Sequence, residues 1–561
     1  MSTSSSGRPI VRVIALVLAV YAAANGLWLW ENGLRCVGSA YHARHFMRAA
    51  QFQVLLADDA PWGSVYRAMH TDRFYPAPLH SFTAAVALNA MDRVIPLVTG
   101  ALNFVWFAAA LAFLALLAVE LGLSASVATW AVLLYALYPA TFGLSRLYGA
   151  FDFQVASLMP LAAWALLRAR GFQSRSSCLL LAGVVAAGLL IKDTFAGYFG
   201  PMFLLALHDA WRSRANRRVM AKNLLLAGAL TGAIISVYYV HPVVLYKEAT
   251  ELLREPTGTR WLLDDWDAYT LRLSDCILSP PFLVLFLGAL AWALRRRTKA
   301  FGDRLLLVWA LAPWLIIMLM PHYKQPCYFS PILPAAALLS AGALHALAPK
   351  PRRAAMGVLL AAGVVQFAAL SFGLGPELPR AWFKTDSTLV FHKGTPVELD
   401  PHQAVVEKLR ALDARDRRDS RVLVLQGWGR QTDMSFYHFF NWLHKMDLEP
   451  AGGVAQLFHG RFLGEDYDKV LLPLPPGWDL QRWVRELHAE SRALAERNWM
   501  VEDAAAVART SPDSFAESME AFLARYPARE ELGRDEGSVF WLLTKAPPKR
   551  GAKPKKAAAR S

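Results

Sequence analysis

Residues 31–80 read ENGLRCVGSAYHARHFMRAAQFQVLLADDAPWGSVYRAMHTDRFYPAPLH and lie between two long apolar segments. This stretch is rich in groups that the hydrocarbon core of a bilayer rejects, among them His42, Arg48, Asp58 and Asp72. We therefore expect residues 31–80 to form a long loop outside the membrane. The apolar segments on either side of it then decide the fold.

The composition is that of a polytopic membrane protein. Of 561 residues, 55% are hydrophobic and 18% are charged, which is more apolar surface than one soluble core can hide. The net charge of +15 comes from Lys and Arg in short loops between apolar segments. That distribution sets membrane topology and argues against a nucleic-acid partner.

Apolar runs of about 17 to 25 residues predict the membrane spans. The first follows Arg8 and Arg12 and is long enough to serve as an uncleaved signal anchor. The stretch 178–210 counts as two spans because Lys192 and Asp193 interrupt it. The eleven predicted spans are 10–30, 94–118, 124–143, 154–168, 178–191, 195–210, 223–241, 279–294, 304–320, 330–348 and 355–374.

The basic residues of the short loops predict the orientation. If the N-terminus is cytoplasmic, every strongly basic short loop falls on the cytoplasmic side, as the positive-inside rule requires. These loops contain Arg168, Arg170 and Arg175; Arg212 to Lys222; Arg295 to Lys299; and Lys350 to Arg353. Eleven spans then place the C-terminal part outside, although the basic tail 549–561 would suit a cytoplasmic end. We expect a bacterial inner-membrane protein with a periplasmic C-terminal domain.

After Pro376 the sequence changes from apolar runs to mixed segments. We expect a transmembrane domain over 1–374, an outer α/β domain over 375–547 and a disordered basic tail over 548–561. Continuous apolar runs at 421–426, 467–474 and 538–545 predict buried strands, while 433–446 and 479–496 have helical spacing. Gly427 and Gly429 follow the first strand without the full glycine fingerprint of a nucleotide site.

The four cysteines, Cys36, Cys178, Cys276 and Cys327, are too few and too scattered for a disulfide framework. One disulfide across the outer face stays open as an alternative. No Cys/His spacing resembles a zinc site. The sequence indicates no particular cofactor, and the participation of a divalent metal stays open.

Candidate functional residues are those that the topology places at the outer ends of the spans. Lys192 and Asp193 interrupt the apolar stretch 178–210, where a charge costs about 2.5 to 3.5 kcal/mol. They are functional candidates, with a mutual ion pair as the structural alternative. For the other charged residues at span ends, the alternative is a solvated rim without chemistry.

Three cations are expected to meet at this surface, namely Arg146, Lys192 and Lys324. Together they would hold an anion at headgroup depth, and a lipid phosphate is the natural ligand. Asp152 would orient a metal, a sugar hydroxyl or the cations themselves. The residues therefore indicate an enzyme or a transporter that acts on a lipid-linked anion.

Several short motifs occur in the order found in one class of membrane enzymes. They are Tyr75-Pro76-Ala77-Pro78-Leu79, Leu137-Tyr138-Pro139 with Ser145-Arg146 and Asp152, Gly188-Leu189-Leu190-Ile191-Lys192, and Lys324 with Tyr328 and Pro331 to Pro334. This arrangement over residues 10–350 resembles the GT-C membrane glycosyltransferases, in particular family 39 with the protein O-mannosyltransferases and the aminoarabinose transferase. Cys327 stands where those enzymes usually have an arginine.

One departure from the family concerns the catalytic acid. The family usually carries Asp-Glu before a juxtamembrane helix in the first outer loop. Here the matching helix begins at Ala40-Tyr41-His42, and Gly38-Ser39 occupy the acidic positions. The resemblance therefore implies a first outer loop with juxtamembrane helices but without the usual base.

The resemblance implies an inverting transfer of a sugar from a polyprenyl-phosphate donor to a glycan, lipid or protein acceptor. Arg146, Lys192 and Lys324 are the candidates for binding the donor phosphate, and Asp152 would organise the site. The candidates for the missing base are Glu31 first, then His42, with the Asp58/Asp59 pair also considered. Further site candidates are Tyr75, Asp193 and Tyr323.

Two other functions stay open at this point. A lipid-linked substrate transporter or flippase predicts charged or broken spans near the midplane and an inverted repeat, and neither is clear in the sequence. A catalytically degenerate GT-C-like protein could instead bind glycans or serve in assembly, which would fit the missing acid.

Overall fold

The computed structural model describes most of the chain. The described residues are 7–32, 40–57, 61–70, 78–91, 95–147, 151–213, 216–242, 244–245, 277–296, 300–319, 326–374, 399–416, 420–425, 447–451, 467–474, 477–479, 482–483, 485–486, 512–534 and 539–545. Two compact units are present. One comprises 1–38 and 48–396, and the other comprises 39–47 and 397–561.

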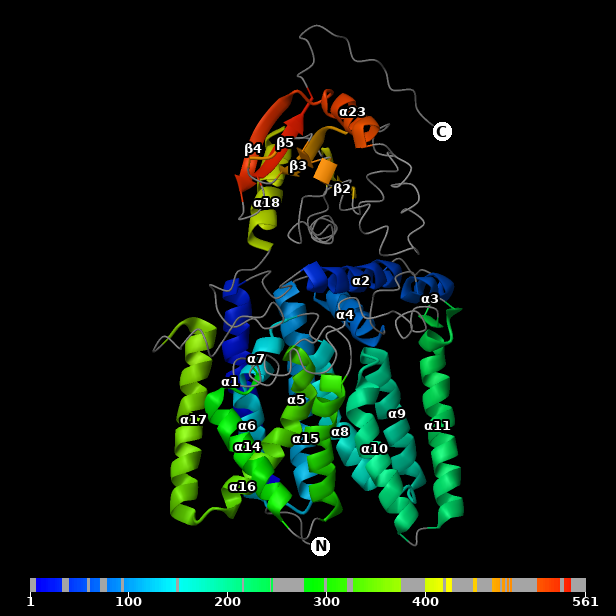
Figure 1. Ribbon diagram of the computed structural model, residues 1–561, viewed down its shortest axis with the longest axis vertical. Coiled ribbons are helices and arrows are strands. Elements are labelled where there is room, and N and C mark those ends of the chain that lie inside the picture. The colour runs from blue at the N-terminus through cyan, green and yellow to red at the C-terminus, as the bar shows by residue number, and fades with distance from the viewer. Residues whose placement is uncertain are drawn as a thin grey trace. The chain divides into compact units, whose positions relative to one another are not determined.

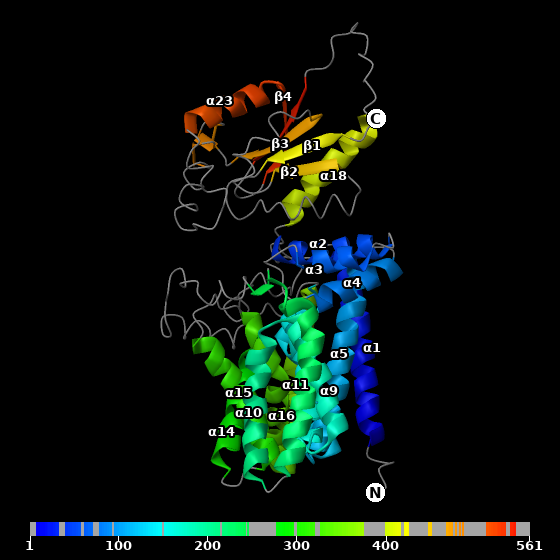
Figure 2. The same cartoon turned by 90° about the vertical axis from the view of Figure 1, so that its right-hand side faces the viewer.

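The first unit is a bundle of long helices (Figures 1 and 2). Each of the eleven predicted spans coincides with a described helix or helix pair. These are α1 (Gly7–Asn32), α5 (Ile95–Glu120), α6 (Ala125–Leu137) with α7 (Pro139–Leu144), α8 (Phe151–Arg168), α9 (Arg175–Ile191), α10 (Phe195–Arg212), α11 (Arg217–Tyr239), α14 (Pro280–Arg295), α15 (Phe301–Leu319), η3 (Pro326–Ile332) with α16 (Leu333–Ala346), and α17 (Pro349–Phe372). The predicted break at Lys192 and Asp193 is confirmed.

Five of the described helical segments are long and apolar enough to cross a membrane. They are Pro9–Glu31, Leu97–Glu120, Arg217–Tyr239, Cys327–Ala346 and Pro349–Phe372. Shorter apolar helices, such as α6, α9 and α14, pack among them. The protein is therefore an integral membrane protein, as its composition predicted.

Burial separates central from peripheral helices. Helices α8 and α16 are rich in alanine and are buried on nearly all sides, whereas α1 and α11 keep most of their apolar side chains at least partly exposed. A helix that is apolar all round and exposed on one side suits contact with lipid tails. Small alanine side chains let the central helices approach closely.

The predicted outer loop contains helices, as the resemblance implied. They are α2 (Ala40–Ala57) and α3 (Trp62–His70). Helix α4 (Leu79–Ala90), which was not predicted, begins where the loop ends. In Figures 1 and 2, α3 lies across the direction of the long helices. Within the first unit, Phe52, Ala68 and Ala85 form a small buried cluster that joins α2, α3 and α4.

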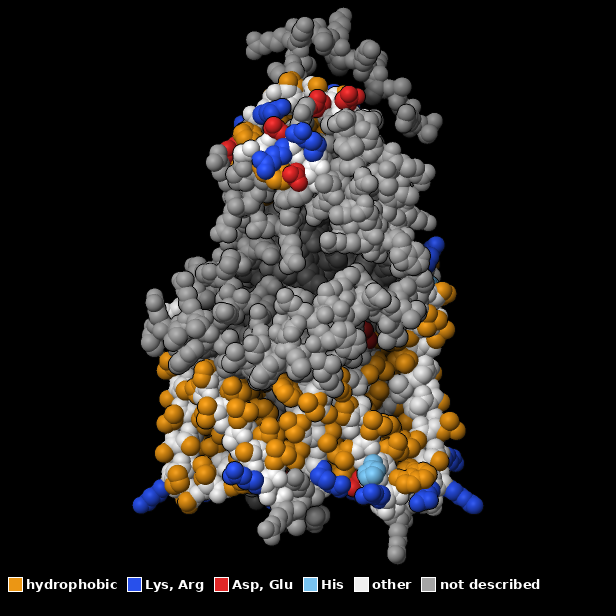
Figure 3. Space-filling model, in the orientation of Figure 1, with side chains coloured by type: hydrophobic (Ala, Val, Ile, Leu, Met, Phe, Trp, Pro, Cys, Tyr) orange, Lys and Arg blue, Asp and Glu red, His pale blue; other side chains and the backbone are white. Residues whose placement is uncertain are grey.

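Lys and Arg side chains gather at one end of the helical unit, below an apolar band (Figure 3). They come from the end of α8, the start of α9, the end of α10, the start of α11, the end of α14 and the start of α17. The basic loops therefore share one end, as the topology prediction requires. Which side of the membrane this end faces stays a prediction.

The second unit contains a five-stranded sheet in the order β2-β1-β3-β5-β4. Its strands are β1 (Arg421–Leu425), β2 (Asp447–Ala451), β3 (Lys469–Leu474), β4 (Ala528–Arg534) and β5 (Val539–Thr544). Strands β2, β1 and β3 are parallel, and β5 is antiparallel to β3 and β4. The strand predictions at 421–426, 467–474 and 538–545 are confirmed by β1, β3 and β5.

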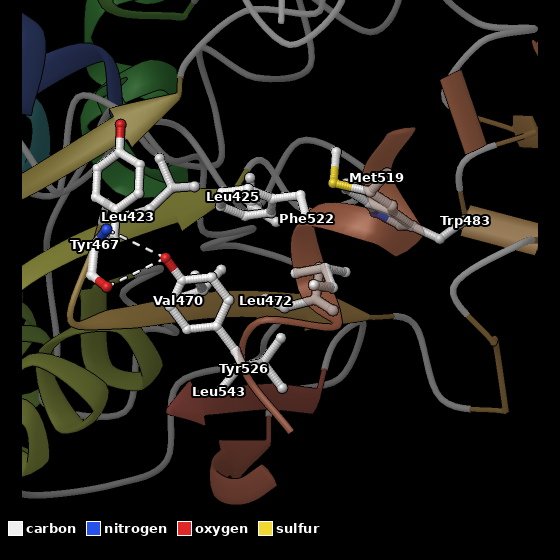
Figure 4. Close-up of a cluster of buried hydrophobic side chains, with 11 residues drawn as sticks. Leu423, Leu425, Tyr467, Val470, Leu472, Trp483, Met519, Phe522, Tyr526 and Leu543 are labelled. Atoms are coloured by element: carbon white, nitrogen blue, oxygen red, sulfur yellow. Dashed lines mark hydrogen bonds between the residues drawn. The ribbon is translucent and has the colours of Figure 1, made fainter. Parts of the chain in front are cut away.

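Among the described residues of this unit, two helices and two strands were not predicted, namely α18 (Leu399–Asp416), α23 (Pro512–Leu523), β2 and β4. One core cluster joins β1, β3 and β5 to α23, with Trp483, Phe522 and Tyr526 among its buried side chains (Figure 4). The helix predicted at 433–446 and most of that at 479–496 lie outside the described residues, as do Gly427 and Gly429.

Candidate functional site

A break between two helices brings Lys192 into the protein interior. Helix α9 ends at Ile191, and Lys192 follows it in an extended conformation, with φ −158° and ψ 132°. The Lys192 amide donates to the Gly188 carbonyl (3.0 Å), and the Phe195 amide that starts α10 donates to the Lys192 carbonyl (3.0 Å). A Cβ atom at Gly188 would lie 2.6 Å from the Phe195 ring, so this tight corner requires glycine.

The Lys192 ammonium makes a buried ion pair with Asp152 in the first turn of α8. Its Nζ lies 2.8 Å from Oδ1 and 2.9 Å from Oδ2 of Asp152. Only 9% of Lys192 and 5% of Asp152 is exposed. A charge this deeply buried is retained only with a close partner, and each residue supplies that partner for the other.

An aromatic side chain from a third element completes the surroundings of the ammonium. Lys192 Nζ lies 4.4 Å from the ring centroid of Tyr328 in η3, a cation–π distance. Tyr198 in α10 holds this residue by donating from its hydroxyl to the Tyr328 carbonyl (2.8 Å). Ser330 Oγ lies 3.3 Å from the Asp152 carbonyl, so η3 is joined to α8 as well. We call Asp152, Lys192, Tyr198, Tyr328 and Ser330 the Lys192 cluster.

The Lys192 cluster lies at the helix ends opposite to the end where the Lys and Arg side chains gather, which we call the basic rim. Asp152 is at the start of α8 and Lys192 at the end of α9, whereas the basic residues occupy the end of α8 and the start of α9. In the predicted topology this end faces outside. The cluster therefore sets a cation, a carboxylate and two phenol side chains near one membrane surface.

Arg146 has a different environment. It is fully buried, and its Nε donates to Asn25 Oδ1 (3.1 Å) and its Nη2 to Ser371 Oγ (2.6 Å). Its guanidinium also lies 4.8 Å from the Trp28 ring centroid and within 6 Å of two further rings. These partners come from α1, α7 and α17, and none of them belongs to the Lys192 cluster.

The other predicted site residues are placed as follows. Glu31 is exposed at the end of α1, and Asp193 is exposed after the α9 break, where its Oδ1 accepts from the Thr194 amide (2.7 Å). The ion pair that Lys192 forms is with Asp152, so the alternative of a Lys192–Asp193 pair is wrong. The side chain of His42 and residues Asp58, Asp59, Tyr75, Tyr323 and Lys324 lie outside the described residues.

Sequence reasoning missed the uncharged polar residues of this end, such as Asn25, Asn103, Tyr198 and Ser371. Each is buried and makes a hydrogen bond to a residue far away in the sequence. A lone amide or hydroxyl in an apolar span is a weak signal, because its partner is not visible locally. Within the described ranges, no group of three or more His, Cys, Asp or Glu side chains is arranged to hold a metal ion.

Solved structures with a similar fold exist. The apo crystal structure of ArnT from Cupriavidus metallidurans matches 96% of this chain and 98% of its own, with a TM-score of 0.57 and 12% identity. The same enzyme bound to undecaprenyl phosphate matches over the same shares, with a TM-score of 0.52 and 12% identity. The chain has a GT-C-like fold.

The GT-C-like fold confirms the resemblance at the level of architecture. At 12% identity the similarity to ArnT concerns the fold alone. No protein-family model matches the sequence, and no curated protein matches it either.

Proposed function

We propose that this protein is a membrane glycosyltransferase that uses a polyprenyl-phosphate sugar as its donor. The observation that carries the proposal is the Lys192 cluster, a buried ammonium at one membrane surface of a GT-C-like bundle. A transferase of this kind must stabilise a lipid phosphate as it leaves. A fixed cation in a site of low dielectric constant suits that task.

The ligand of a similar structure supports the choice of donor. ArnT with the same overall architecture has been crystallised with undecaprenyl phosphate, and we infer a lipid of that class for this chain. A lipid donor also fits a site at the end of apolar helices, where the lipid tail stays in the bilayer while the phosphate meets the cation.

In the proposed reaction the acceptor hydroxyl attacks the anomeric carbon of the donor sugar. The new carbon–oxygen bond forms on the face opposite to the leaving group, so the configuration inverts. The bond between the anomeric carbon and the phosphate oxygen breaks, and its electron pair stays on the phosphate. Lys192 stabilises this charge, and Asp152 with Tyr328 holds the ammonium in place.

The acceptor proton must go to a base. Glu31 is the first candidate, because it is a solvent-exposed carboxylate at the end of α1 on the side of the Lys192 cluster. His42 in α2 is the second, since the usual pKa of histidine lies near the working pH. We propose Lys324 as a second phosphate ligand. The acceptor is a glycan, a lipid or a protein at the outer, periplasmic face.

Radiolabelled polyprenyl-phosphate sugars test this proposal with purified protein in nanodiscs. Wild type should transfer sugar, and Lys192→Ala should lower kcat/KM by about 100-fold, the scale of losing one preorganised donor to a developing charge. Lys350→Ala is the matched control, because it removes the same charge from an exposed site on α17 at the basic rim. Glu31→Gln then tests the assignment of the base alone.

The outcomes separate the alternatives. Transfer that is insensitive to Lys192→Ala would overturn the role of the Lys192 cluster. The absence of transfer with all donors, together with retained binding of undecaprenyl phosphate, would favour the degenerate or transporter functions over the enzyme.

A further inference from the structure

One asparagine ties the turn at 145–147, which follows α7, to the first turn of α8. Asn103 lies in α5 and is 1% exposed. Its Nδ2 donates to the carbonyls of Ser145 (2.7 Å) and Leu147 (3.0 Å) in the turn after α7. Its Oδ1 accepts from Gln154 Nε2 (3.1 Å) in α8.

These contacts satisfy backbone carbonyls that would otherwise lack a hydrogen-bond partner in the protein interior. The carbonyls after a helix end have no partner within the helix, and no water reaches them in an apolar interior. Asn103 supplies both donors from a neighbouring helix. Asn25 in α1 supports the same turn by donating from Nδ2 to Ser145 Oγ (3.0 Å).

The anchored turn fixes the position of Asp152. Gln154 is two residues beyond Asp152 in the first turn of α8, so the Asn103–Gln154 hydrogen bond sets where that turn begins. In this position both carboxylate oxygens of Asp152 lie within hydrogen-bond distance of Lys192 Nζ. Because an ion pair of this length tolerates little displacement, a shift of α8 would separate the two charges.

We propose that Asn103 is a positioning residue for the Asp152–Lys192 pair. It touches neither charge and acts through the backbone of the turn and the first residues of α8. The importance of this role for sugar transfer rests on the proposed function, whereas its effect on the ion pair does not.

Helix α5 offers a matched control one turn earlier. Thr99 is also 1% exposed, and its Oγ1 has no hydrogen-bond partner among the described residues. Thr99→Val therefore removes a buried polar group of the same helix without removing a contact to the turn.

The test measures how fast Lys192 is acetylated by an amine-reactive ester, with peptide mass spectrometry of the full-length protein in nanodiscs. Asn103→Leu removes all three hydrogen bonds and should raise the rate at Lys192 severalfold. Asn103→Ala removes the same three hydrogen bonds without adding bulk or charge, so it is a second variant with a different demand on packing. Asp152→Asn gives the acetylation rate of a Lys192 that has lost its carboxylate partner, and the rate at exposed Lys350 is the internal reference.

Rates at Lys192 that stay at the wild-type value in both Asn103 variants, or that rise equally in Thr99→Val, would overturn the proposal. Sugar transfer is measured on the same samples. A wild type without transfer but with faster acetylation in the Asn103 variants would contradict the proposed function and leave the positioning role supported. In an active protein, Asn103→Leu should lower kcat/KM far less in an Asp152→Asn background than in wild type, because the two residues act in series.

Discussion

At the level of single residues, the buried Asp152–Lys192 pair should dominate the response of the helical unit to mutation. Lys192→Met leaves a carboxylate without its ammonium in the interior, at a cost of about 3–5 kcal/mol. The double variant Lys192→Met with Asp152→Asn carries no charge and should regain most of that loss. Thermal unfolding of the single and double variants in the same detergent measures the difference. Losses that simply add would show that the pair is not coupled.

The contacts of Lys192 also show what could not be predicted from the sequence. The apolar surroundings of Lys192 marked it as a candidate, and Asp152 was named with it. The sequence places Asp193 directly beside Lys192, but their side chains diverge at the helix break, and the carboxylate that meets the ammonium comes from another helix 40 positions away. A contact of that kind is set by packing and is not visible in local sequence.

At the level of elements, the corner between α9 and α10 depends on a close approach. Gly188→Ala places a Cβ 2.6 Å from the Phe195 ring, so the corner must open and displace Lys192. We expect sugar transfer to fall by at least about tenfold, since a shift near 1 Å costs up to about 100-fold. Gly183→Ala is the matched control, because a Cβ at that position of α9 meets no atom within 4 Å.

A second substitution checks the cause of that loss. Phe195→Leu removes the ring that the new methyl group meets, and it should restore part of the activity of Gly188→Ala. Failure of this rescue, or an equal loss in Gly183→Ala, would contradict the steric explanation.

A histidine outside the spans makes the packing of α3 sensitive to pH. His70 stacks on His241 beyond the end of α11, with ring centroids 4.0 Å apart, and its Nδ1 lies 2.6 Å from the Tyr66 carbonyl. Burial lowers the pKa of His70 from its ordinary value of 6.5, the Tyr66 carbonyl opposes that shift, and His241 and Arg48 add to it. A lowered pKa means that the folded form prefers neutral His70. The stability that it contributes is therefore present above pH 6.5 and is lost as the pH falls through the lower folded value.

Hydrogen exchange of the 62–70 backbone amides measures this effect. Protection factors corrected for the intrinsic pH dependence of amide exchange should fall severalfold between about pH 7.5 and about pH 5.5. In this range the locally unfolded form, with the ordinary histidine pKa of 6.5, binds a proton more readily than the folded form does. His70→Phe keeps a stacking ring without an ionisable group and should reduce the pH dependence. His208→Phe, at an exposed position of α10, should leave it unchanged.

Elements were predictable where composition alone decides them. Long apolar runs fixed the helices of the membrane unit, and the continuous apolar runs RVLVL and KVLLPL marked β1 and β3. Strand β4, with the sequence AREELGR, is a charged edge strand without an apolar run, and β2 carries Pro450 at the other edge. Edge strands take their conformation from pairing, so the local pattern contains little to find.

At the scale of the whole molecule, the topology is the prediction that places the Lys192 cluster outside. Alkaline phosphatase fused after Leu425 should be active in the periplasm, and the same enzyme fused after Ser213 at the basic rim should be inactive. The reverse pattern would put the Lys192 cluster in the cytoplasm and, with eleven spans, would place the N-terminus outside.

The proposed mechanism requires a polyprenyl phosphate to bind at Lys192. A photoreactive short-chain polyprenyl phosphate, cross-linked to the full-length protein in nanodiscs, tests it most directly. We predict labelled peptides from 188–200 and 326–346, with labelling competed by undecaprenyl phosphate, abolished by Lys192→Ala and retained by Lys350→Ala. Competed labelling that is confined to other segments, or that persists unchanged in Lys192→Ala, would contradict it.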